Sequence, residues 1–296
     1  MQVRFCGVRG STPAPGIDFV RYGGHTSCLA LAHDDAPAPT LVLDAGIGLR
    51  AVTRVLCGTP FAGTIMLSHL HWDHVLELPF FAAGDRADSH VQMLIPEQEC
   101  GRDAVGLLAG VMSPPYFPIG PTMLRGSWTF KTIGPGELQV EGFTVLAREI
   151  PHKGGRTFGY RISDGRSTLT YMPDHCPTML GAGTHGFGAC HPVALELAHE
   201  TDLLVHDAQL FPEELAAEAD FGHAVGDYAV ELARRAGARA VALTHHRFDR
   251  TDDALDALAR RLGSDGEDGG PRVSVAAEGT VVQLPAPVVA HTPAAP

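Results

Sequence analysis

Lysine is nearly absent from this sequence. Of its 22 basic residues only Lys131 and Lys153 are lysines, and 34 acidic residues bring the net charge to −12. A protein that binds nucleic acids generally needs a basic footprint that releases counterions from phosphates. The acidic balance therefore argues against a general nucleic-acid binder.

Long apolar runs and paired cysteines are also missing. No stretch of about 18 apolar residues occurs, so we expect no membrane-spanning helix and no membrane partner. The first residues, Met-Gln-Val-Arg-Phe-Cys, do not have the pattern of a secretory signal. The six cysteines form no C-x-x-C pair, which favours reduced and mostly buried thiols. We therefore expect a cytoplasmic protein.

What is present is enough apolar material for a large core. Hydrophobic residues make up 45% of the 296 residues and charged residues 19%, which is typical of a soluble globular protein. The length would allow two domains. Because no linker divides the chain, we expect one domain over residues 1–284, followed by a flexible C-terminal tail over 285–296.

Short apolar segments separated by glycine-rich turns predict many strands and few helices. Periodicity favours helices near 49–56, 225–236 and 255–262. Alternating or buried-type segments favour strands at 3–8, 28–32, 41–43, 64–68, 143–149, 158–162, 168–172, 203–205, 240–243, 273–276 and 281–284.

The strongest motif is Ser68-His69-Leu70-His71-Trp72-Asp73-His74. It places four metal-ligating side chains within six residues, directly after an apolar segment. If the strand continued, His69, His71 and Asp73 would share one face, and a turn would bring in His74. Imidazole nitrogens and carboxylate oxygens are the ligands that zinc, iron and manganese accept.

Further candidate ligands follow later predicted strands. A single catalytic zinc uses few protein ligands and keeps one position open, so this surplus predicts two ions rather than one. Ligands from separate strand ends can converge at one edge of a sheet. The candidates are His152, Asp174, His206 and His245.

The order H-x-H-x-D-H, a lone His, a lone Asp and a last His resembles the metallo-β-lactamase superfamily over most of the chain. The resemblance implies a four-layered αββα sandwich. It also implies that His69, His71 and His152 bind one metal, that Asp73, His74 and His245 bind a second, and that Asp174 bridges them. Asp44 in Leu-Asp-Ala-Gly matches an early Asp that supports the metal-binding loop by hydrogen bonds.

Three stretches are similar to the tRNase Z-type phosphodiesterases and the phosphoribosyl cyclic phosphodiesterases of that superfamily. They are His206-Asp207-Ala208, Gly222-His223-Ala224 and Leu243-Thr244-His245. The resemblance implies that His223 is the proton donor, oriented by a neighbour such as His206 or Asp207. Asp73, His206 and His223 are accordingly the candidate catalytic residues.

We therefore expect a dinuclear metal-dependent hydrolase, a phosphodiesterase in which a hydroxide bridging the metals attacks phosphorus. Zinc is the expected metal, with manganese and iron as alternatives. The alternative function is a carbonyl hydrolase of the same fold that acts on a lactone, thioester or amide. A binding module without activity is a third hypothesis, disfavoured because every expected ligand position is filled.

One departure from the resembled branch bears on the partner. The tRNA-processing members carry a long arm between the third His and the Asp, whereas only about twenty residues separate His152 from Asp174 here. Together with the acidic charge, this predicts a small-molecule or cyclic phosphodiester as substrate and argues against tRNA. The family likeness also predicts a homodimer.

Two further features leave alternatives open. Arg9, Arg21, Lys153 and Arg156 lie in predicted loops, where one of them could bind a phosphate oxygen, although each one singly is more often a solvated surface charge. The segment 112–118 (Met-Ser-Pro-Pro-Tyr-Phe-Pro) is either a lid or dimer element beside the substrate or a packed connection.

Overall fold

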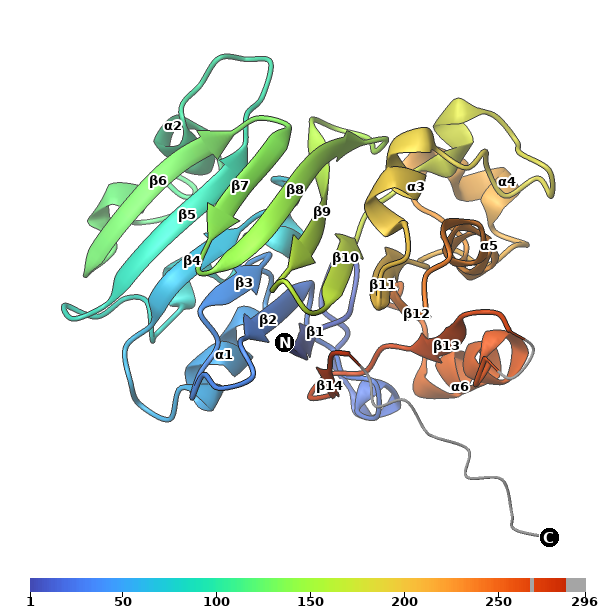
Figure 1. Ribbon diagram of the computed structural model, residues 1–296. Helices are drawn as coiled ribbons and strands as arrows, with labels where there is room; N and C mark the ends of the chain where they lie inside the picture. Colours follow the sequence, from blue (N-terminus) through green and yellow to red (C-terminus); the bar gives the residue numbers. More distant parts are fainter. Residues whose placement is uncertain (267–268, 286–296) are drawn as a thin grey trace, which may run out of the picture.

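Two seven-stranded sheets face each other through an apolar interior (Figure 1). The computed structural model describes residues 1–266 and 269–285, and all counts of elements refer to these residues. The first sheet has the strand order β14 (Val281–Gln283), β1 (Gln2–Gly7), β2 (Cys28–Ala32), β3 (Leu41–Leu43), β4 (Ala62–Met66), β5 (His90–Pro96) and β6 (Ser127–Ile133). The second has the order β13 (Arg272–Val275), β12 (Ala240–Thr244), β11 (Leu203–Asp207), β10 (Thr168–Met172), β9 (Thr157–Ser163), β8 (Phe143–Ile150) and β7 (Gly136–Val140).

Each sheet contains a parallel half, which positions the candidate site. Strands β3 to β6 run parallel to one another, and so do β10 to β13. The carboxyl ends of parallel strands in a sheet share one edge. The polar residues that follow β10, β11 and β12 are therefore delivered to the same edge of the second sheet.

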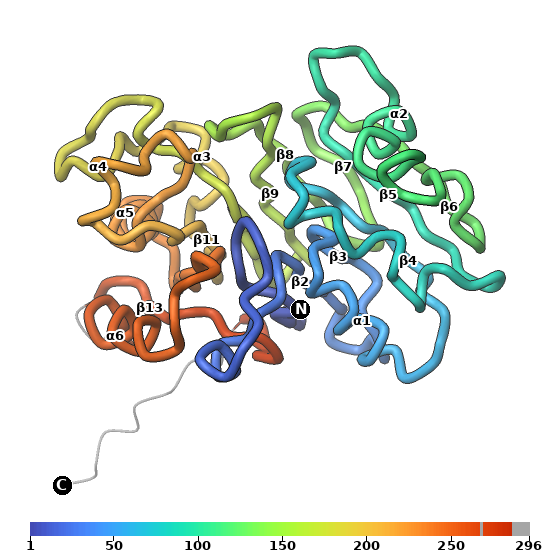
Figure 2. Tube along the Cα trace, turned by 180° about the vertical axis from the view of Figure 1, so that it is seen from behind, coloured from blue at the N-terminus to red at the C-terminus, as the bar shows by residue number. Residues whose placement is uncertain are grey.

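Helices cover the outer faces of the two sheets, as Figures 1 and 2 show from opposite sides. α1 (Leu49–Val55) and α2 (Ala104–Ala109) pack on the first sheet in one apolar cluster. α3 (Pro192–Ala198), α5 (Gly226–Ala236) and α6 (Asp252–Leu262) pack on the second in another. A third cluster, which includes Phe5, Phe158 and Tyr160, fills the space between the sheets. The predicted αββα sandwich is confirmed.

α5 forms because its apolar residues recur at helical spacing. Tyr228, Ala229, Leu232, Ala233 and Ala236 are buried against the second sheet, as an amphipathic helix requires. The helix ends at Gly237, whose φ of 69° suits glycine better than any residue with a side chain. No candidate ligand lies on α5, but the helix packs against the second sheet, whose strands β10 and β12 lead into candidate ligands.

The predicted strands and helices are found close to their expected bounds, with one exception that bears on the site. β4 ends at Met66, and His69 to His71 lie in a loop that leads into a 3₁₀ turn, η2 (Trp72–His74). The expectation that His69, His71 and Asp73 share one strand face is therefore wrong. The chain leaves the sheet because the backbone N–H of Ser68 donates to the Asp44 carboxylate at 2.6 Å.

Two other expectations remain predictions. The single domain over residues 1–284 is one. The flexible tail over 285–296 falls, apart from Pro285, outside the described residues. In the part of the chain that is described, no helix combines the length and the apolar character needed to cross a bilayer.

Candidate metal centre and active site

Asp44 organises the loop that carries the H-x-H-x-D-H motif. It is fully buried at the end of β3, and its φ is 61°. Its Oδ2 accepts from His74 Nδ1 at 2.8 Å, from Ser68 Oγ at 2.9 Å and from the Tyr171 hydroxyl at 2.8 Å. These bonds fix the ring of His74 with its Nε2 directed toward the other candidate ligands. The supporting role that the resemblance implied for Asp44 agrees with this geometry.

Seven of the side chains that the sequence singled out as ligands lie in two adjoining groups, whereas the eighth, His206, lies in neither. In each group the potential ligand atoms lie within 4.8 Å of one another. Asp73 and His74 both lie in η2, whereas His152, Asp174 and His245 follow β8, β10 and β12. The first group is His69, His71, His152 and Asp174, and the second is Asp73, His74 and His245.

Asp174 lies between the two groups. Its Oδ2 is 3.6 Å from His69 Nε2 and 3.4 Å from His152 Nε2. Its Oδ1 is 3.2 Å from His74 Nε2 and 3.1 Å from His245 Nε2. One carboxylate therefore presents one oxygen to each group, which is the arrangement that a ligand shared by two cations needs.

Several of these buried atoms lack hydrogen-bond partners. They are His69 Nε2, His74 Nε2, Asp174 Oδ1 and His245 Nδ1. A buried polar atom without a partner costs about 1–3 kcal/mol, so a cluster of them calls for a compensating group. Divalent cations fit this site, because the converging atoms are imidazole nitrogens and carboxylate oxygens.

The protonation states in the first group also suit cations. Burial lowers the pKa of His69 well below its ordinary value and that of His152 to about 4, so both rings are neutral near pH 7. Burial alone would raise the pKa of Asp174, but the neighbouring His245 and His74 hold it well below the usual range. Neutral imidazoles and an ionised carboxylate are the forms that bind metals.

His152 is fixed from outside the cluster. Its Nδ1 donates to the carbonyl of Gly222 at 2.7 Å, which leaves Nε2 for the cluster. This contact ties the loop after β8 to the segment that carries His223.

His223 lies beside the cluster and bonds to Asp207. The two side chains meet through Nδ1 and Oδ2 at 2.9 Å. Burial would lower the pKa of His223, but Asp207 and other nearby carboxylates raise it to about 9. A protonated imidazole next to the cluster is able to donate a proton.

His206 is placed differently. Its Nδ1 bonds to the carbonyl of Asp207 at 2.8 Å, and its Nε2 to His175 Nδ1 at 3.0 Å. Of the two neighbours named above for orienting His223, Asp207 makes the hydrogen bond, whereas His206 packs behind it against Tyr228.

The N-terminal loop closes the other side of the site, a feature that the motif did not reveal. The backbone N–H of Ser11 donates to Asp73 Oδ2 at 2.7 Å. Gly10 lies against the ring of His245, and its N–H donates to the carbonyl of His246 at 2.9 Å. The ring of His246 itself points away and bonds to the carbonyl of Ala276 at 2.8 Å.

A cavity of about 660 Å³ opens beside this cluster. Its floor includes His71, Asp73 and His223, and its walls carry the exposed aromatic side chains Trp72, Phe221 and Phe248. The segment 112–118 is not among its lining residues. Phe117 instead contacts Phe80 edge-on at 5.6 Å.

Three of the four cations considered for phosphate binding have structural partners. Arg9 is fully buried and donates to the carbonyls of Gly23 and Arg250. Arg21 pairs with three aspartates of α6, and Arg156 pairs with Glu97 and Glu149. The basic residue that reaches the cavity is Arg247, which the sequence reasoning missed.

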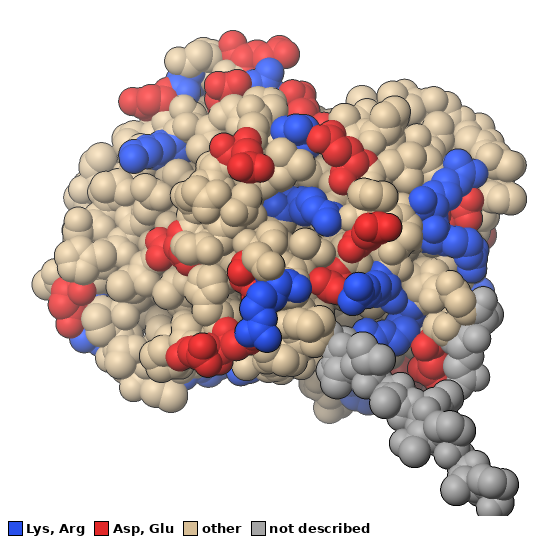
Figure 3. Space-filling model, viewed as in Figure 1, with Lys and Arg blue, Asp and Glu red and all other residues tan. Residues whose placement is uncertain are grey.

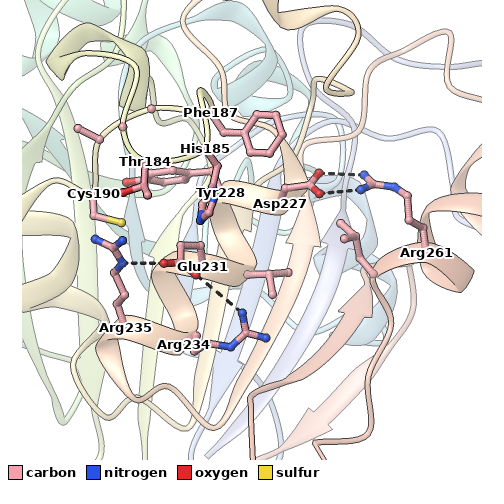
Figure 4. Close-up of a pocket in the computed structure, with 15 residues that line it drawn as sticks. Thr184, His185, Phe187, Cys190, Asp227, Tyr228, Glu231, Arg234, Arg235 and Arg261 are labelled. Carbon is pink, nitrogen blue, oxygen red and sulfur yellow. Dashed lines mark hydrogen bonds and ion pairs between the residues drawn. The ribbon is translucent and has the colours of Figure 1, made fainter. Parts of the chain in front are cut away.

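A second cavity of about 630 Å³ lies between the 183–190 loop and α5 (Figure 4). Its charged side chains form ion pairs with one another. The carboxylate of Asp227 lies 2.6 Å from the guanidinium of Arg261, and that of Glu231 lies 2.7 Å from the guanidinium of Arg235. It contains none of the candidate ligands.

Comparison with known proteins agrees with this architecture. A family model described as the beta-lactamase superfamily domain matches residues 40–246. A ribonuclease Z of Halobacterium salinarum is 34% identical over 252 residues, which cover 83% of this chain and 67% of that protein.

Two solved structures share the fold. A diphosphatase of the PhnP family has a TM-score of 0.65 and 16% identity, covering 95% of this chain and 97% of that one. The short form of human tRNase Z has a TM-score of 0.60 and 19% identity, covering 96% of this chain and 100% of that one.

These comparisons overturn one expectation, that tRNA is not a partner. Relatives named ribonuclease Z and a neighbour named tRNase Z conflict with it. The short interval between His152 and Asp174 excludes an insertion at that point only, and other segments project from the sheets. Net charge is equally indirect, because basic and acidic side chains are interspersed over the face shown in Figure 3.

Proposed function

Because this chain belongs to the beta-lactamase superfamily and is a hydrolase of that superfamily, we propose that the bond it cleaves is a phosphodiester. The observation that carries the proposal is the His223–Asp207 pair, 2.9 Å apart, beside a cluster built to hold cations. The names of the relatives, ribonuclease Z and a diphosphatase, support the same type of bond.

In this proposal two divalent ions occupy the two groups. His69, His71 and His152 would hold one, Asp73, His74 and His245 the other, and Asp174 both. Zinc fits these ligands, and manganese or iron would fit them as well. Bound ions would make a water nucleophilic at neutral pH and offset charge on the phosphate oxygens.

The chain's own residues supply the remaining steps. Asp207 holds the Nδ1 proton of His223, which leaves Nε2 as the atom that protonates the departing oxygen. Such general-acid catalysis is typically worth ~10²–10⁴-fold in rate. Asp73 is held by the Ser11 N–H, so that its carboxylate keeps a fixed orientation toward His74 and His245.

The leaving group of a phosphodiester suits the proton donor of this site. An alkoxide leaving from phosphorus needs a proton, and His223 is placed and charged to provide one. Small or cyclic phosphodiesters fit the cavity of about 660 Å³, and RNA phosphodiesters belong in the same substrate class.

The test is a substrate panel for the metal-loaded protein. It contains bis-p-nitrophenyl phosphate, cyclic nucleotides and a precursor tRNA, with p-nitrophenyl acetate, a lactone and a thioester as the carbonyl arm. We expect phosphodiester turnover that falls in His223→Ala and persists in the matched control His90→Ala, which changes an exposed histidine on β5. Hydrolysis of carbonyl substrates alone, by protein that retains its metal, would overturn the proposal in favour of the carbonyl hydrolase.

A further inference from the structure

We propose that the mouth of the active-site cavity is a binding platform for a nucleobase, formed by the aromatic side chains of Trp72, Phe221 and Phe248. The inference rests on the proposed function, because the base would belong to the molecule whose phosphodiester reaches the cluster. It narrows the substrate class to nucleotidyl phosphodiesters, in which a base lies next to the scissile phosphate.

The three side chains are unusually exposed for their type. Trp72 is 69% exposed, Phe221 60% and Phe248 41%. Among the described residues only two other large aromatics are comparably exposed, Phe80 and Tyr116. Three of these five therefore gather around one cavity. A concentration of exposed apolar rings beside catalytic groups is the signature of a ligand site rather than of a random surface.

The three rings come from separate segments, and those of Phe221 and Phe248 are tied together. Trp72 lies on η2 between His71 and Asp73, Phe221 ends a 3₁₀ turn, η6 (Ala219–Phe221), and Phe248 follows β12. Arg247 Nη1 bonds to Glu218 Oε2 at 2.6 Å, which joins the segment of Phe221 to that of Phe248. The two walls that carry Phe221 and Phe248 are thus joined before any ligand enters, which reduces the entropy lost on binding.

The floor of the cavity is polar. Ser11, Gln209 and His223 line it together with the candidate ligands. The amide of Gln209 lies 3.4 Å from the Ser11 hydroxyl, and its backbone N–H is held by Asp207 Oδ1 at 2.9 Å. A nucleobase matches this surface because it combines a flat apolar face with polar edges. An alkyl chain would leave the polar groups without partners.

The charge at the cavity supports recognition of a base rather than of additional phosphates. Arg247 is bonded to Glu218 and Asp249 at 2.6 and 3.1 Å, so its positive charge is offset. Base–aromatic stacking does not depend on such a cation. The site would therefore hold the phosphodiester at the cluster and the adjoining base on the rings.

Calorimetric titration of the metal-loaded protein with AMP and with ribose 5-phosphate tests the platform without requiring turnover. Stacking is worth roughly 5- to 150-fold in affinity per base, so AMP is expected to bind at least about five-fold more tightly. Phe221→Ala and Phe248→Ala should each remove most of this preference and leave the binding of ribose 5-phosphate unchanged. The control Phe80→Ala, an exposed aromatic outside the cavity, should change neither.

A second readout locates the base. The chain has only two tryptophans, Trp72 and Trp128, so in a Trp128→Phe protein the fluorescence reports Trp72 alone. AMP should quench it saturably and ribose 5-phosphate should not. If Trp128→Phe does not fold, the calorimetric comparison still decides.

Equal affinities for AMP and ribose 5-phosphate would overturn the platform, as would no detectable binding of AMP. Equal weakening of both ligands in Phe221→Ala, or hexyl phosphate binding as tightly as AMP, would also overturn it. Failure of the proposed function looks different, because AMP would still bind in preference to ribose 5-phosphate while no phosphodiester is hydrolysed.

Discussion

Gly10 and His245 are in direct contact, and the contact leaves no room for a side chain. A β-carbon at residue 10 would lie 2.3 Å from His245 Nδ1 and 2.5 Å from Gln209 Oε1. The backbone of Gly10 cannot withdraw, because its N–H is bonded to the carbonyl of His246. A glycine 235 residues away along the chain therefore limits where the last candidate ligand can lie.

Gly10→Ala should displace His245 and weaken one of the two metal positions. We expect the affinity for one ion to fall by about tenfold or more, since a shift of a fraction of an ångström spoils ligand geometry. Metal content measured by elemental analysis after dialysis against a graded chelator would show it. Gly120→Ala is the matched control, because its nearest neighbour is a carbonyl at 3.9 Å. Identical metal retention in the two variants would show that the contact is unimportant.

Asp207→Asn should lower turnover without removing metal. The substitution takes away the negative charge that keeps the pKa of His223 near 9, so the imidazole is less often protonated and less firmly oriented. We expect kcat to fall by roughly 10- to 100-fold with little change in KM, as for a group acting in the transition state. Asp227→Asn, which alters an ion pair on α5, serves as control. A proportionate rise in KM at constant kcat would contradict the assignment.

Arg9→Met should destabilise the fold. Arg9 is fully buried, and its guanidinium donates to the carbonyls of Gly23 and Arg250 at 2.7 and 2.6 Å. Removing these donors leaves buried acceptors unpaired, at a cost of ~2–4 kcal/mol in the free energy of unfolding. Urea denaturation would measure the difference, with Arg54→Met on the exposed face of α1 as control. Equal midpoints for the two variants would refute the prediction.

Chelation of bound metal should lower the melting temperature. Cations that bind only the folded chain stabilise it by about 2.7 kcal/mol per site at a concentration one hundred times Kd. For a chain of this size we expect a shift of roughly 4 °C per site, and the shift should vary with metal concentration. Scanning calorimetry with and without chelator measures it. The same shift in Asp174→Asn as in the unaltered chain would show that Asp174 holds no ion.

The clustering of the candidate ligands could largely be anticipated from the sequence, because these residues stand in a compact motif or directly after apolar strands. The reasoning failed where local geometry depends on distant residues. The strand expected over 64–68 ends at Met66, because Asp44, 24 residues before Ser68, accepts the Ser68 N–H.

Other elements gave a weak signal. β6 and β7 lie at the edges of their sheets with half of their residues exposed, so their hydrophobic patterns resemble those of loops.

The cavity walls were missed for a different reason. Trp72, Phe221 and Phe248 are joined only in three dimensions, and no spacing in the sequence relates them. The argument against tRNA failed because a global charge and one loop length do not describe the surface around the site.

The rate of cyclic nucleotide hydrolysis, in which the leaving alkoxide needs a proton, by the metal-loaded protein and by His223→Ala, with metal counted in the same samples, tests the central claim most directly. The account predicts two ions per chain in both proteins and a rate ~10²–10⁴-fold lower in the variant. Equal rates in the two proteins, or two ions per chain with no phosphodiester turnover in the unaltered protein, would contradict it.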